Sequence, residues 1–279
     1  MNKRRDFIKT LGALGITAAA MYTFPGCYRK DPDIGIQLYT LRDPIKDGVV
    51  PVLEDLSKIG YNNIEAYGFN GKFFDFDPKE FKKIVNDLGM KLTSTHTGIT
   101  LENADEYIEA AKIAGLQFLV IPYPGSWPHE SIEDYKMMAE QFNLIGEKVS
   151  AAGMNLGYHN HALEFELKDG EVPYDILLKE TDPELVCFQP DIYWFKKGGA
   201  DPIEYFNEYP GRFKVWHIKD MAANGETTAA GKGNIDFPEI FKFADIAGMK
   251  YFYVEQEQYD KAAIDCCAES WEYLRELRG

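Results

Sequence analysis

Short apolar runs alternate with longer amphipathic segments along most of this chain. The short runs lack regular polar alternation, which is typical of parallel strands that are buried on both faces. We expect eight such strands, at Gly35–Tyr39, Asn63–Ala66, Lys91–Thr95, Phe118–Ile121, Asn155–His159, Val186–Pro190, Phe213–His217 and Tyr251–Glu255. Apolar residues spaced three and four positions apart predict helices between the strands. These helices are expected at Val49–Ile59, Pro78–Leu88, Ala104–Ala114, Ser131–Ala152, Tyr174–Glu180, Pro202–Glu208, Phe237–Ala247 and Lys261–Leu277.

A glycine follows five of the predicted helices, at Gly60, Gly89, Gly115, Gly153 and Gly248. Glycine adopts the left-handed conformation that ends many helices at little cost. The repeated order of helix, glycine and strand indicates βα units, and eight of them in about 250 residues match the usual size of a TIM barrel. We therefore predict an α/β fold, a single-domain (β/α)8 TIM barrel over residues 34–279. An open doubly wound sheet is the alternative, but the first strand is not followed by the glycine pattern of a nucleotide-binding loop.

The N-terminus has a separate character. A basic segment, Lys3–Lys9, precedes an apolar run of small residues, Leu11–Phe24, which is short for a spanning helix of about 20 residues. Its paired arginines resemble a twin-arginine (Tat) export signal. We expect residues 1–26 to be a signal peptide, residues 27–33 a linker, and the protein to be periplasmic. Phe24–Cys27 resembles an imperfect lipobox, so a lipid anchor on Cys27 and simple cleavage remain alternatives, and membrane contact is expected only through the signal or this anchor.

Composition narrows the classes of partner. The formal net charge of −15 argues against a nucleic-acid partner, because phosphates bind basic surfaces. The four cysteines form neither a disulfide framework nor a zinc-finger pattern, and the adjacent Cys266 and Cys267 are not expected to bridge each other. The oligomeric state stays open, with a homo-oligomer as one option.

Four predicted strands end in an imidazole or a carboxylate: His159, Asp191, His217 and Glu255. They belong to strands five to eight, and the carboxyl ends of parallel barrel strands share one rim. Taken alone, such a histidine is usually structural and such an aspartate usually caps the next helix. Together they form a ligand set for a divalent metal, with Mn²⁺ preferred and Mg²⁺, Co²⁺, Fe²⁺ or Zn²⁺ as alternatives. A metal that grips a ketone and its neighbouring hydroxyl acidifies the C–H between them, so we predict a small-molecule sugar substrate.

Further polar and aromatic residues lie at the same predicted rim. Lys219 could donate to a substrate hydroxyl or stabilise an enolate oxygen, and an ion pair with Asp220 is the alternative. A tryptophan could stack on a sugar ring or pack in the core. The predicted substrate-binding residues are Glu65, His96, His161, Trp194 and Lys219.

From about residue 33 onward the chain resembles the sugar phosphate isomerase/epimerase branch of the xylose-isomerase-like TIM barrels. The resemblance is carried by the segments Gly60–Glu65, Thr95–Gly98, His159–His161, Glu164–Phe165, Asp191–Trp194, Asp201–Pro202, Pro210–Phe213, His217–Asp220, Gly231–Phe237 and Val254–Gln256. It implies a metal held by Glu, Asp, His and Glu from strands five to eight. Asp191, His217 and Glu255 match the last three positions, whereas His159 stands where many relatives have Glu.

The resemblance implies an isomerase or epimerase that works through a metal-stabilised enediolate, with Glu255, His159 and Lys219 as catalytic residues. In epimerases of the superfamily, the glutamates of strands five and eight move the proton on opposite faces, and an imidazole differs in charge and basicity. A lyase or dehydratase that carries out β-elimination on a keto-sugar, keto-inositol or 3-keto-glycoside is therefore the alternative. A non-catalytic periplasmic sugar-binding protein is a third alternative, and the intact Asp191, His217 and Glu255 argue against it.

Overall fold

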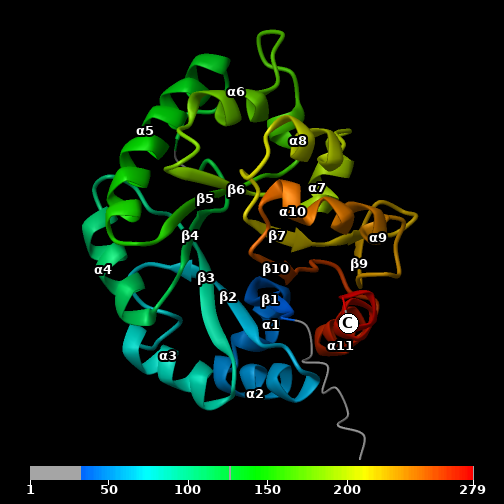
Figure 1. Cartoon of the computed structure of the whole chain (residues 1–279). Helices are drawn as coiled ribbons and strands as arrows, with labels where there is room; N and C mark the ends of the chain where they lie inside the picture. Colours follow the sequence, from blue (N-terminus) through cyan, green and yellow to red (C-terminus); the bar gives the residue numbers. More distant parts are fainter. Residues whose placement is uncertain (1–32, 126, 279) are drawn as a thin grey trace, which may run out of the picture. The chain divides into compact units, whose positions relative to one another are not determined.

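The computed structural model describes residues 33–125 and 127–278, and its centre is a barrel of parallel strands (Figure 1). Predictions that concern the N-terminal signal and Cys27 lie outside the described residues. The barrel strands are β1 (Gly35–Gln37), β2 (Asn63–Phe69), β3 (Lys91–Thr97), β4 (Phe118–Ile121), β5 (Asn155–His159), β6 (Val186–Gln189), β7 (Val215–Ile218) and β10 (Tyr251–Val254).

The strands follow the order β6-β5-β4-β3-β2-β1-β10-β7, and each neighbouring pair is parallel. Parallel bridges from Phe188 to Phe213 and from Asp191 to His217 join β6 to β7. The N–H of His217 also donates to the carbonyl of Pro190 at 3.0 Å. These contacts bring the two outer strands together, so the predicted TIM barrel is confirmed.

Helices surround the barrel and connect consecutive strands (Figure 1). Local signals explain their ends: Ser131 and Asp134 form a capping box at the start of α5, and Gly115 ends α4 with φ +81°. The helices are α1 (Arg42–Ile45), α2 (Val49–Ile59), α3 (Pro78–Asp87), α4 (Ala104–Ala114), α5 (Ile132–Ala151), α6 (Pro173–Glu180), α7 (Ile192–Lys197), α8 (Pro202–Glu208), α9 (Phe237–Ile240), α10 (Ala244–Ala247) and α11 (Ala263–Arg278).

The predicted elements differ from the structure mainly at short segments. The first strand ends at Gln37 because its side chain accepts a hydrogen bond from the N–H of Tyr39 and starts a 3₁₀ helix. The helix expected at Phe237–Ala247 is divided into α9, a 3₁₀ turn and α10. Helix α7 and the hairpin of β8 (Asp220–Met221) and β9 (Thr227–Thr228) were not predicted.

The barrel interior is apolar toward the amino ends of the strands. Phe118, Val120, Cys187, Val215 and Tyr253 form a buried cluster inside the strands, separate from the larger core between strands and helices. Glycine is required beside this cluster, because a Cβ on Gly35 would lie 2.4 Å from the ring of Tyr253. We call these five residues the apolar plug.

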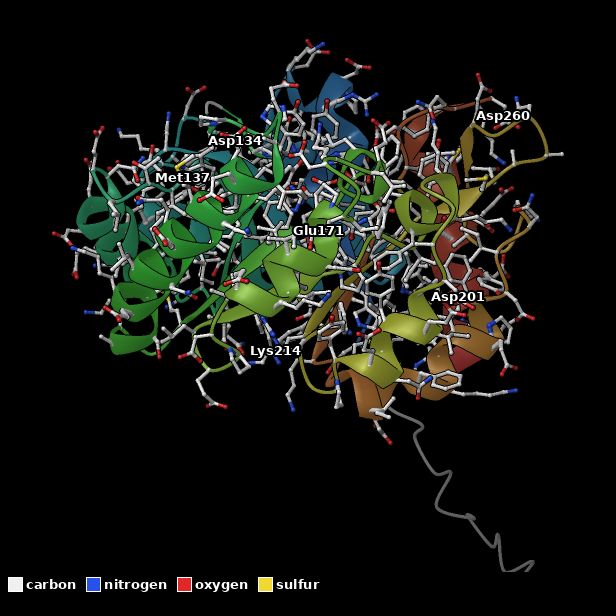
Figure 2. The ribbon with its side chains drawn as sticks, turned by 90° about the horizontal axis from the view of Figure 1, so that it is seen from above. Asp134, Met137, Glu171, Asp201, Lys214 and Asp260 are labelled. Atoms are coloured by element: carbon white, nitrogen blue, oxygen red, sulfur yellow. The ribbon has the colours of Figure 1, made fainter. Side chains whose placement is uncertain are left out.

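The described surface is acidic in several places. Glu171, Asp201 and Asp260 are exposed on separate segments (Figure 2). Cys187, Cys266 and Cys267 are buried free thiols, which confirms that the adjacent pair does not bridge. In residues 33–125 and 127–278, no helix is both long enough and apolar enough to cross a membrane.

Candidate active site and metal centre

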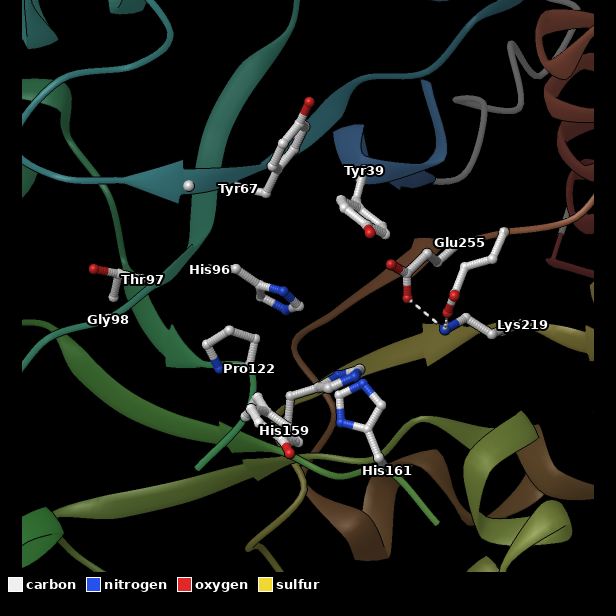
Figure 3. A pocket seen from close by; sticks show the side chains of 13 residues that line it. Tyr39, Tyr67, His96, Thr97, Gly98, Pro122, His159, His161, Lys219 and Glu255 are labelled. Carbon is white, nitrogen blue, oxygen red and sulfur yellow. Dashed lines mark hydrogen bonds and ion pairs between the residues drawn. The ribbon is translucent and has the colours of Figure 1, made fainter. Parts of the chain in front are cut away.

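A cavity of about 350 Å³ opens where the barrel strands end (Figure 3). Aromatic side chains from three loops and strand ends, Tyr39, Tyr67 and Tyr123, form its rim. Its histidine and charged lining residues are His96, His159, His161, Lys219, Glu255 and Glu257. The chemistry-bearing residues therefore converge at the carboxyl ends of the strands, as in other TIM barrels.

His159, Asp191, His217 and Glu255 lie together at this end of the barrel. Each offers one ligand atom, and these atoms all lie within 4.8 Å of one another. His159 ends β5, Asp191 follows β6, His217 lies in β7, and Glu255 follows β10. The structure thus brings together the four residues that the sequence selects as metal ligands.

Asp191 provides a test of whether this group fits a metal. Its Oδ1 accepts a hydrogen bond from the N–H of Trp194 and caps α7. Its Oδ2 is buried without a hydrogen bond of good geometry, although the Nζ of Lys219 lies 2.9 Å away. A buried carboxylate oxygen whose close neighbour is a cationic group is a suitable ligand for a metal cation, which would share this oxygen with Lys219 or replace the lysine there.

The charge of the site also favours a cation. Four carboxylates, Glu65, Asp191, Glu255 and Glu257, contact Lys219 or His217. Even with both basic groups protonated, two negative charges remain in excess. The donor atoms and the charge therefore both fit a divalent metal ion.

His217 lies between two carboxylates. Its Nδ1 is 2.9 Å from Glu255 and its Nε2 is 2.5 Å from Glu65. Burial alone would lower the pKa of His217, but these carboxylates outweigh burial and raise its pKa to about 10. For Glu255, burial acts to raise the pKa, but Lys219 and His217 hold it well below its ordinary value.

Glu65 does not line the cavity, although it is a predicted substrate-binding residue. It is 0% exposed and lies beneath the imidazoles. Its carboxylate accepts hydrogen bonds from the side chains of Gln37 at 2.8 Å, Ser94 at 2.5 Å and Gln189 at 2.8 Å, and also contacts His217. The reason is geometric: Glu65 lies inside β2 and points into the barrel, so neighbouring strands cover it.

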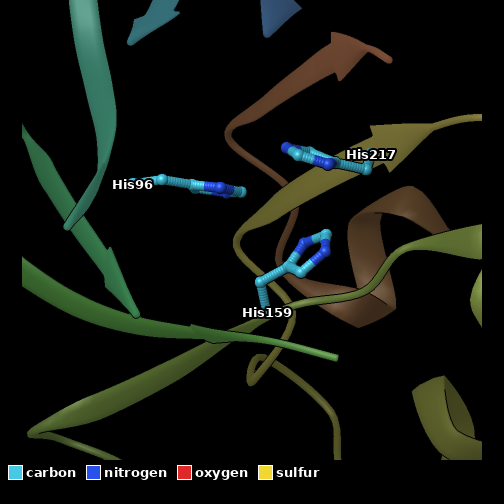
Figure 4. A group of neighbouring side chains, drawn as sticks. All are labelled: His96, His159 and His217. Atoms are coloured by element: carbon cyan, nitrogen blue, oxygen red, sulfur yellow. The ribbon is translucent and has the colours of Figure 1, made fainter. Parts of the chain in front are cut away.

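The rings of His96, His159 and His217 pack against one another (Figure 4). His96 lies nearly parallel to His217, with ring centroids 5.2 Å apart. The Oε1 of Gln189 is 2.7 Å from the Nε2 of His96 and 3.1 Å from the Nδ1 of His159. Burial is the main cause that lowers the pKa of His96 and of His159, so both rings are neutral at neutral pH.

His161 lines the cavity as predicted, and its buried Nδ1 has no hydrogen-bond partner among the described residues. Burial, assisted by Lys219, lowers the pKa of His161 to about 3. Trp194 lies behind His161, with ring centroids 5.1 Å apart. Trp194 is not among the described residues that line the cavity, and its contact with a substrate stays a prediction.

Lys219 pairs with acidic residues that are distant in sequence. Its Nζ lies 2.9 Å from Glu255 (Figure 3). It also lies 2.9 Å from Asp191 and 2.7 Å from Glu257. The alternative pairing with Asp220 is not observed. Asp220 instead accepts backbone N–H groups of Met221, Gly231, Gly233 and Ile235, which shapes that loop.

Several residues of the site were missed from the sequence: Gln37, Tyr39, Ser94, Gln189 and Glu257. Gln189 had a recognisable signal, since it is a polar residue in the apolar run Val186–Gln189 and has the same inward parity as Cys187. Glu257 lies two residues beyond Glu255 and so points the same way while the chain stays extended. Tyr39 ends the first predicted strand, but in the structure it lies in the 3₁₀ helix that follows β1.

The site can hold a cation and move a proton. Glu255 supplies an ionised carboxylate, Lys219 an ammonium group, and His161 a neutral imidazole, and all three face one cavity. A carboxylate base beside a cationic donor is suited to removing a proton next to a carbonyl and stabilising the resulting oxyanion.

Known proteins are similar to this chain in sequence and in fold. The sequence model of a family described as xylose isomerase-like TIM barrel matches residues 53–277. The crystal structure of a sugar phosphate isomerase/epimerase from Parabacteroides distasonis ATCC 8503 has a TM-score of 0.77 and 33% identity, covering 89% of this chain and 95% of that chain.

Curated relatives are more distant. An inosose dehydratase from Lacticaseibacillus casei is 24% identical over 250 residues, which cover 75% of this chain and 82% of that protein. An inosose dehydratase from Geobacillus thermodenitrificans is 27% identical over 168 residues, which cover 53% of this chain and only 56% of the length of that protein.

Proposed function

Because the chain belongs to the xylose isomerase-like TIM barrel family, we propose that it is a metal-dependent, sugar-modifying enzyme that removes a proton next to the carbonyl of a keto-sugar. The names of its relatives, isomerase/epimerase and dehydratase, leave the specific reaction open. The observation that carries the proposal is the convergence of His159, Asp191, His217 and Glu255 beside one cavity.

We assign the metal to these four residues and prefer Mn²⁺. A divalent cation held there would polarise a substrate carbonyl and so acidify the neighbouring C–H. The remaining chemistry belongs to the protein. We assign Glu255 as the base, since its carboxylate lines the cavity and its lowered pKa keeps it ionised. Lys219, whose ammonium lies 2.9 Å from Glu255, would donate to the oxyanion that develops when the proton leaves.

The geometry of His159 argues against a second base. Its Nδ1 faces the amide oxygen of Gln189, which can only accept a hydrogen bond, so this nitrogen carries the proton. If the Nε2 holds a cation, the ring has no lone pair left to take up a proton. We therefore assign His159 as a ligand only, in place of the predicted catalytic role.

A site with one carboxylate base favours β-elimination. Glu255 takes the proton, the C–H electron pair forms a C=C bond as the C–O bond to the β substituent breaks, and the proton passes from Glu255 to the departing oxygen, which leaves as water or an alcohol. We propose this lyase or dehydratase reaction as the first candidate, in line with the inosose dehydratases among the relatives. We assign His161, a neutral imidazole with a free Nδ1, to hydrogen-bond the departing hydroxyl or glycosidic oxygen. Isomerisation or epimerisation by one base is the second candidate, favoured by the 33% identical Parabacteroides structure.

The cavity favours an unphosphorylated substrate. Lys219 is the one lysine or arginine among its described lining residues, and it is already paired with three carboxylates. A phosphate dianion would also meet the carboxylates of Glu255 and Glu257. We propose an uncharged keto-sugar, keto-inositol or 3-keto-glycoside, which agrees with the proposal of Tat export to the periplasm.

The test is incubation of the purified protein with keto-inositol, free sugars and 3-keto-glycosides in D₂O with Mn²⁺, followed by NMR. An unsaturated product with loss of the β substituent supports the first candidate. Deuterium at the carbon next to the carbonyl with an inverted centre or a moved carbonyl supports the second. A protein that binds no divalent metal and exchanges no proton with any of these substrates contradicts both.

A further inference from the structure

A layer of polar side chains lies beneath the imidazoles. It consists of four side chains that are 0% exposed: Gln37 of β1, Glu65 of β2, Ser94 of β3 and Gln189 of β6. Gln37, Ser94 and Gln189 each donate a hydrogen bond to Glu65. We call these four residues the polar floor. We propose that Gln189 is a positioning residue that selects the tautomer of His159 and thereby leaves the lone pair on Nε2, the ring nitrogen that Gln189 does not contact, free for a metal. This inference rests on the proposed metal-dependent function.

The orientation of the Gln189 amide follows from its partner. Its Nε2 lies 2.8 Å from Oε2 of Glu65. Glu65 is already the acceptor for Gln37 and Ser94, so the amide nitrogen, which only donates, must face it. The amide oxygen therefore faces the rings of His96 and His159.

The tautomer of His159 follows from the amide oxygen. An amide oxygen accepts but never donates, so the Nδ1 at 3.1 Å must carry a proton. A neutral imidazole carries only one proton, and only a neutral imidazole binds a metal. The lone pair is then on Nε2. The same oxygen fixes the Nε2–H tautomer of His96, whose Nε2 lies 2.7 Å away.

Positioning of this kind matters for an imidazole more than for a carboxylate. An ionised carboxylate has no tautomers and can bind a cation through either oxygen. A neutral imidazole has a lone pair on one nitrogen only, and in the wrong tautomer it presents an N–H to the cation. Hydrogen bonds to the second ring nitrogen fix the tautomer of metal-binding histidines, and their loss weakens metal binding by about 10- to 100-fold. Gln189 is the partner that His159 has for this purpose in the described structure.

Gln37 offers a matched control. It is equally buried, and its amide also donates to Glu65 at 2.8 Å. In the described part of the chain it hydrogen-bonds to Glu65, Ala66 and Tyr39 but to no histidine. Gln37→Met and Gln189→Met therefore remove one hydrogen bond each from the same carboxylate, and only the second removes contacts to imidazoles.

The first measurement is Mn²⁺ affinity of the metal-free full chain by competition with a chelator. We expect Gln189→Met to weaken binding by about 10- to 100-fold and Gln37→Met by about threefold or less. Equal losses in the two variants would overturn the proposal and leave a merely structural role. If the parent protein binds no Mn²⁺, the proposed function fails instead, so the two failures are distinguishable.

A double-mutant cycle isolates His159 from His96. In a His159→Glu background the residue at position 159 is a carboxylate, which has no tautomer for Gln189 to select. Gln189→Met is therefore expected to change Mn²⁺ affinity by about threefold or less in this background. A loss as large as in the parent background would show that Gln189 acts through another group, which overturns the proposal.

The tautomer itself can be read in the unmodified protein, whatever the variants do to folding. The chain has five histidines, so long-range ¹H–¹⁵N spectra of histidine-labelled, metal-free protein are simple enough to assign. We expect the Nδ1–H tautomer for His159. An Nε2–H tautomer would contradict the inference directly.

Discussion

The two halves of the barrel interior differ sharply although the same strands build both. The apolar plug contains Cys187, Val215 and Tyr253. Nearer the carboxyl ends of the same strands lie the buried polar residues Gln189, His217 and Glu255, which we call the polar layer. Each residue of the second set follows one of the first by two positions, so both point inward from one strand. A shift of two residues therefore separates a position that stabilises the fold from one that serves the site. Substitutions in the two layers should have opposite signatures.

The largest effect is expected for Asp191→Asn in the proposed metal-ligand group. The amide oxygen can still cap α7 through Trp194, but the charged ligand is lost. We expect kcat/KM to fall by roughly 10³- to 10⁴-fold, because a metal supplies several kcal/mol of transition-state stabilisation. Elemental analysis should show loss of metal, while circular dichroism keeps the parent signal. Unchanged metal content would contradict the assignment of this ligand.

The converse change is Phe118→Ala in the apolar plug. Phe118 is 2% exposed, and removal of such a ring costs about 3–5 kcal/mol of unfolding free energy. Urea denaturation of the metal-free protein measures this loss. We expect the Mn²⁺ affinity of the folded variant to stay near the parent value. If the variant keeps its stability but loses metal, the assignment of stability to the apolar plug and of metal binding to the polar residues is contradicted.

Glu255→Gln should separate proton transfer from metal binding. The amide keeps an oxygen for the metal but is no base, so we expect solvent deuterium exchange into the substrate to fall by about 10²- to 10⁴-fold. The control is Glu257→Gln, which also removes a carboxylate partner of Lys219 but leaves the proposed base intact. Exchange at the parent rate in Glu255→Gln, or an equal loss in the control, would exclude Glu255 as the base.

The pH dependence of metal binding sharpens the role of His217. Burial opposes protonation, but Glu255 and Glu65 raise the pKa of His217 to about 10, so a cation must displace a proton at neutral pH. We expect Mn²⁺ affinity to increase with pH by up to about tenfold per unit below this pKa. Calorimetry in buffers of different ionisation enthalpy should show proton release on binding. Affinity that is independent of pH between 6 and 9 would argue against ligation by His217.

The stability of the metal-free protein should change with pH in the opposite direction. The folded pKa of His217 lies above its unfolded value of about 6.5. Its contribution to stability is therefore complete below about pH 6.5 and is lost as the pH rises through about 10. The midpoint of urea unfolding should decrease over this range, and His217→Gln should reduce the decrease.

Much of the fold followed from local patterns. The bounds of β4, β5, α2, α4 and α8 agree with the predicted ones, because apolar periodicity, helix caps and terminal glycines are local. The segment Phe237–Ala247 was less predictable, since packing divides its helical pattern into short pieces. Helix α7 depends on the cap that Asp191 supplies, and the pattern of apolar residues does not reveal it.

The candidate site divides in the same way. Once eight parallel strands close into a barrel, their carboxyl ends must share a rim, so the meeting of His159, Asp191, His217 and Glu255 could be predicted from the sequence. Which side chains then contact one another depends on distances across the barrel. Periodicity along one strand carries no information about these distances.

The sequence by itself determined the order of strands and helices and the identity of the groups at the rim, since both depend on residues close together in the chain. Only the tertiary structure decided that Glu65 supports His217 from below, that Trp194 lies behind His161, and that Lys219 avoids the adjacent Asp220. The physical reason is that burial, hydrogen bonding and charge balance act between strands that are far apart in sequence. Those interactions exist only after the barrel has closed.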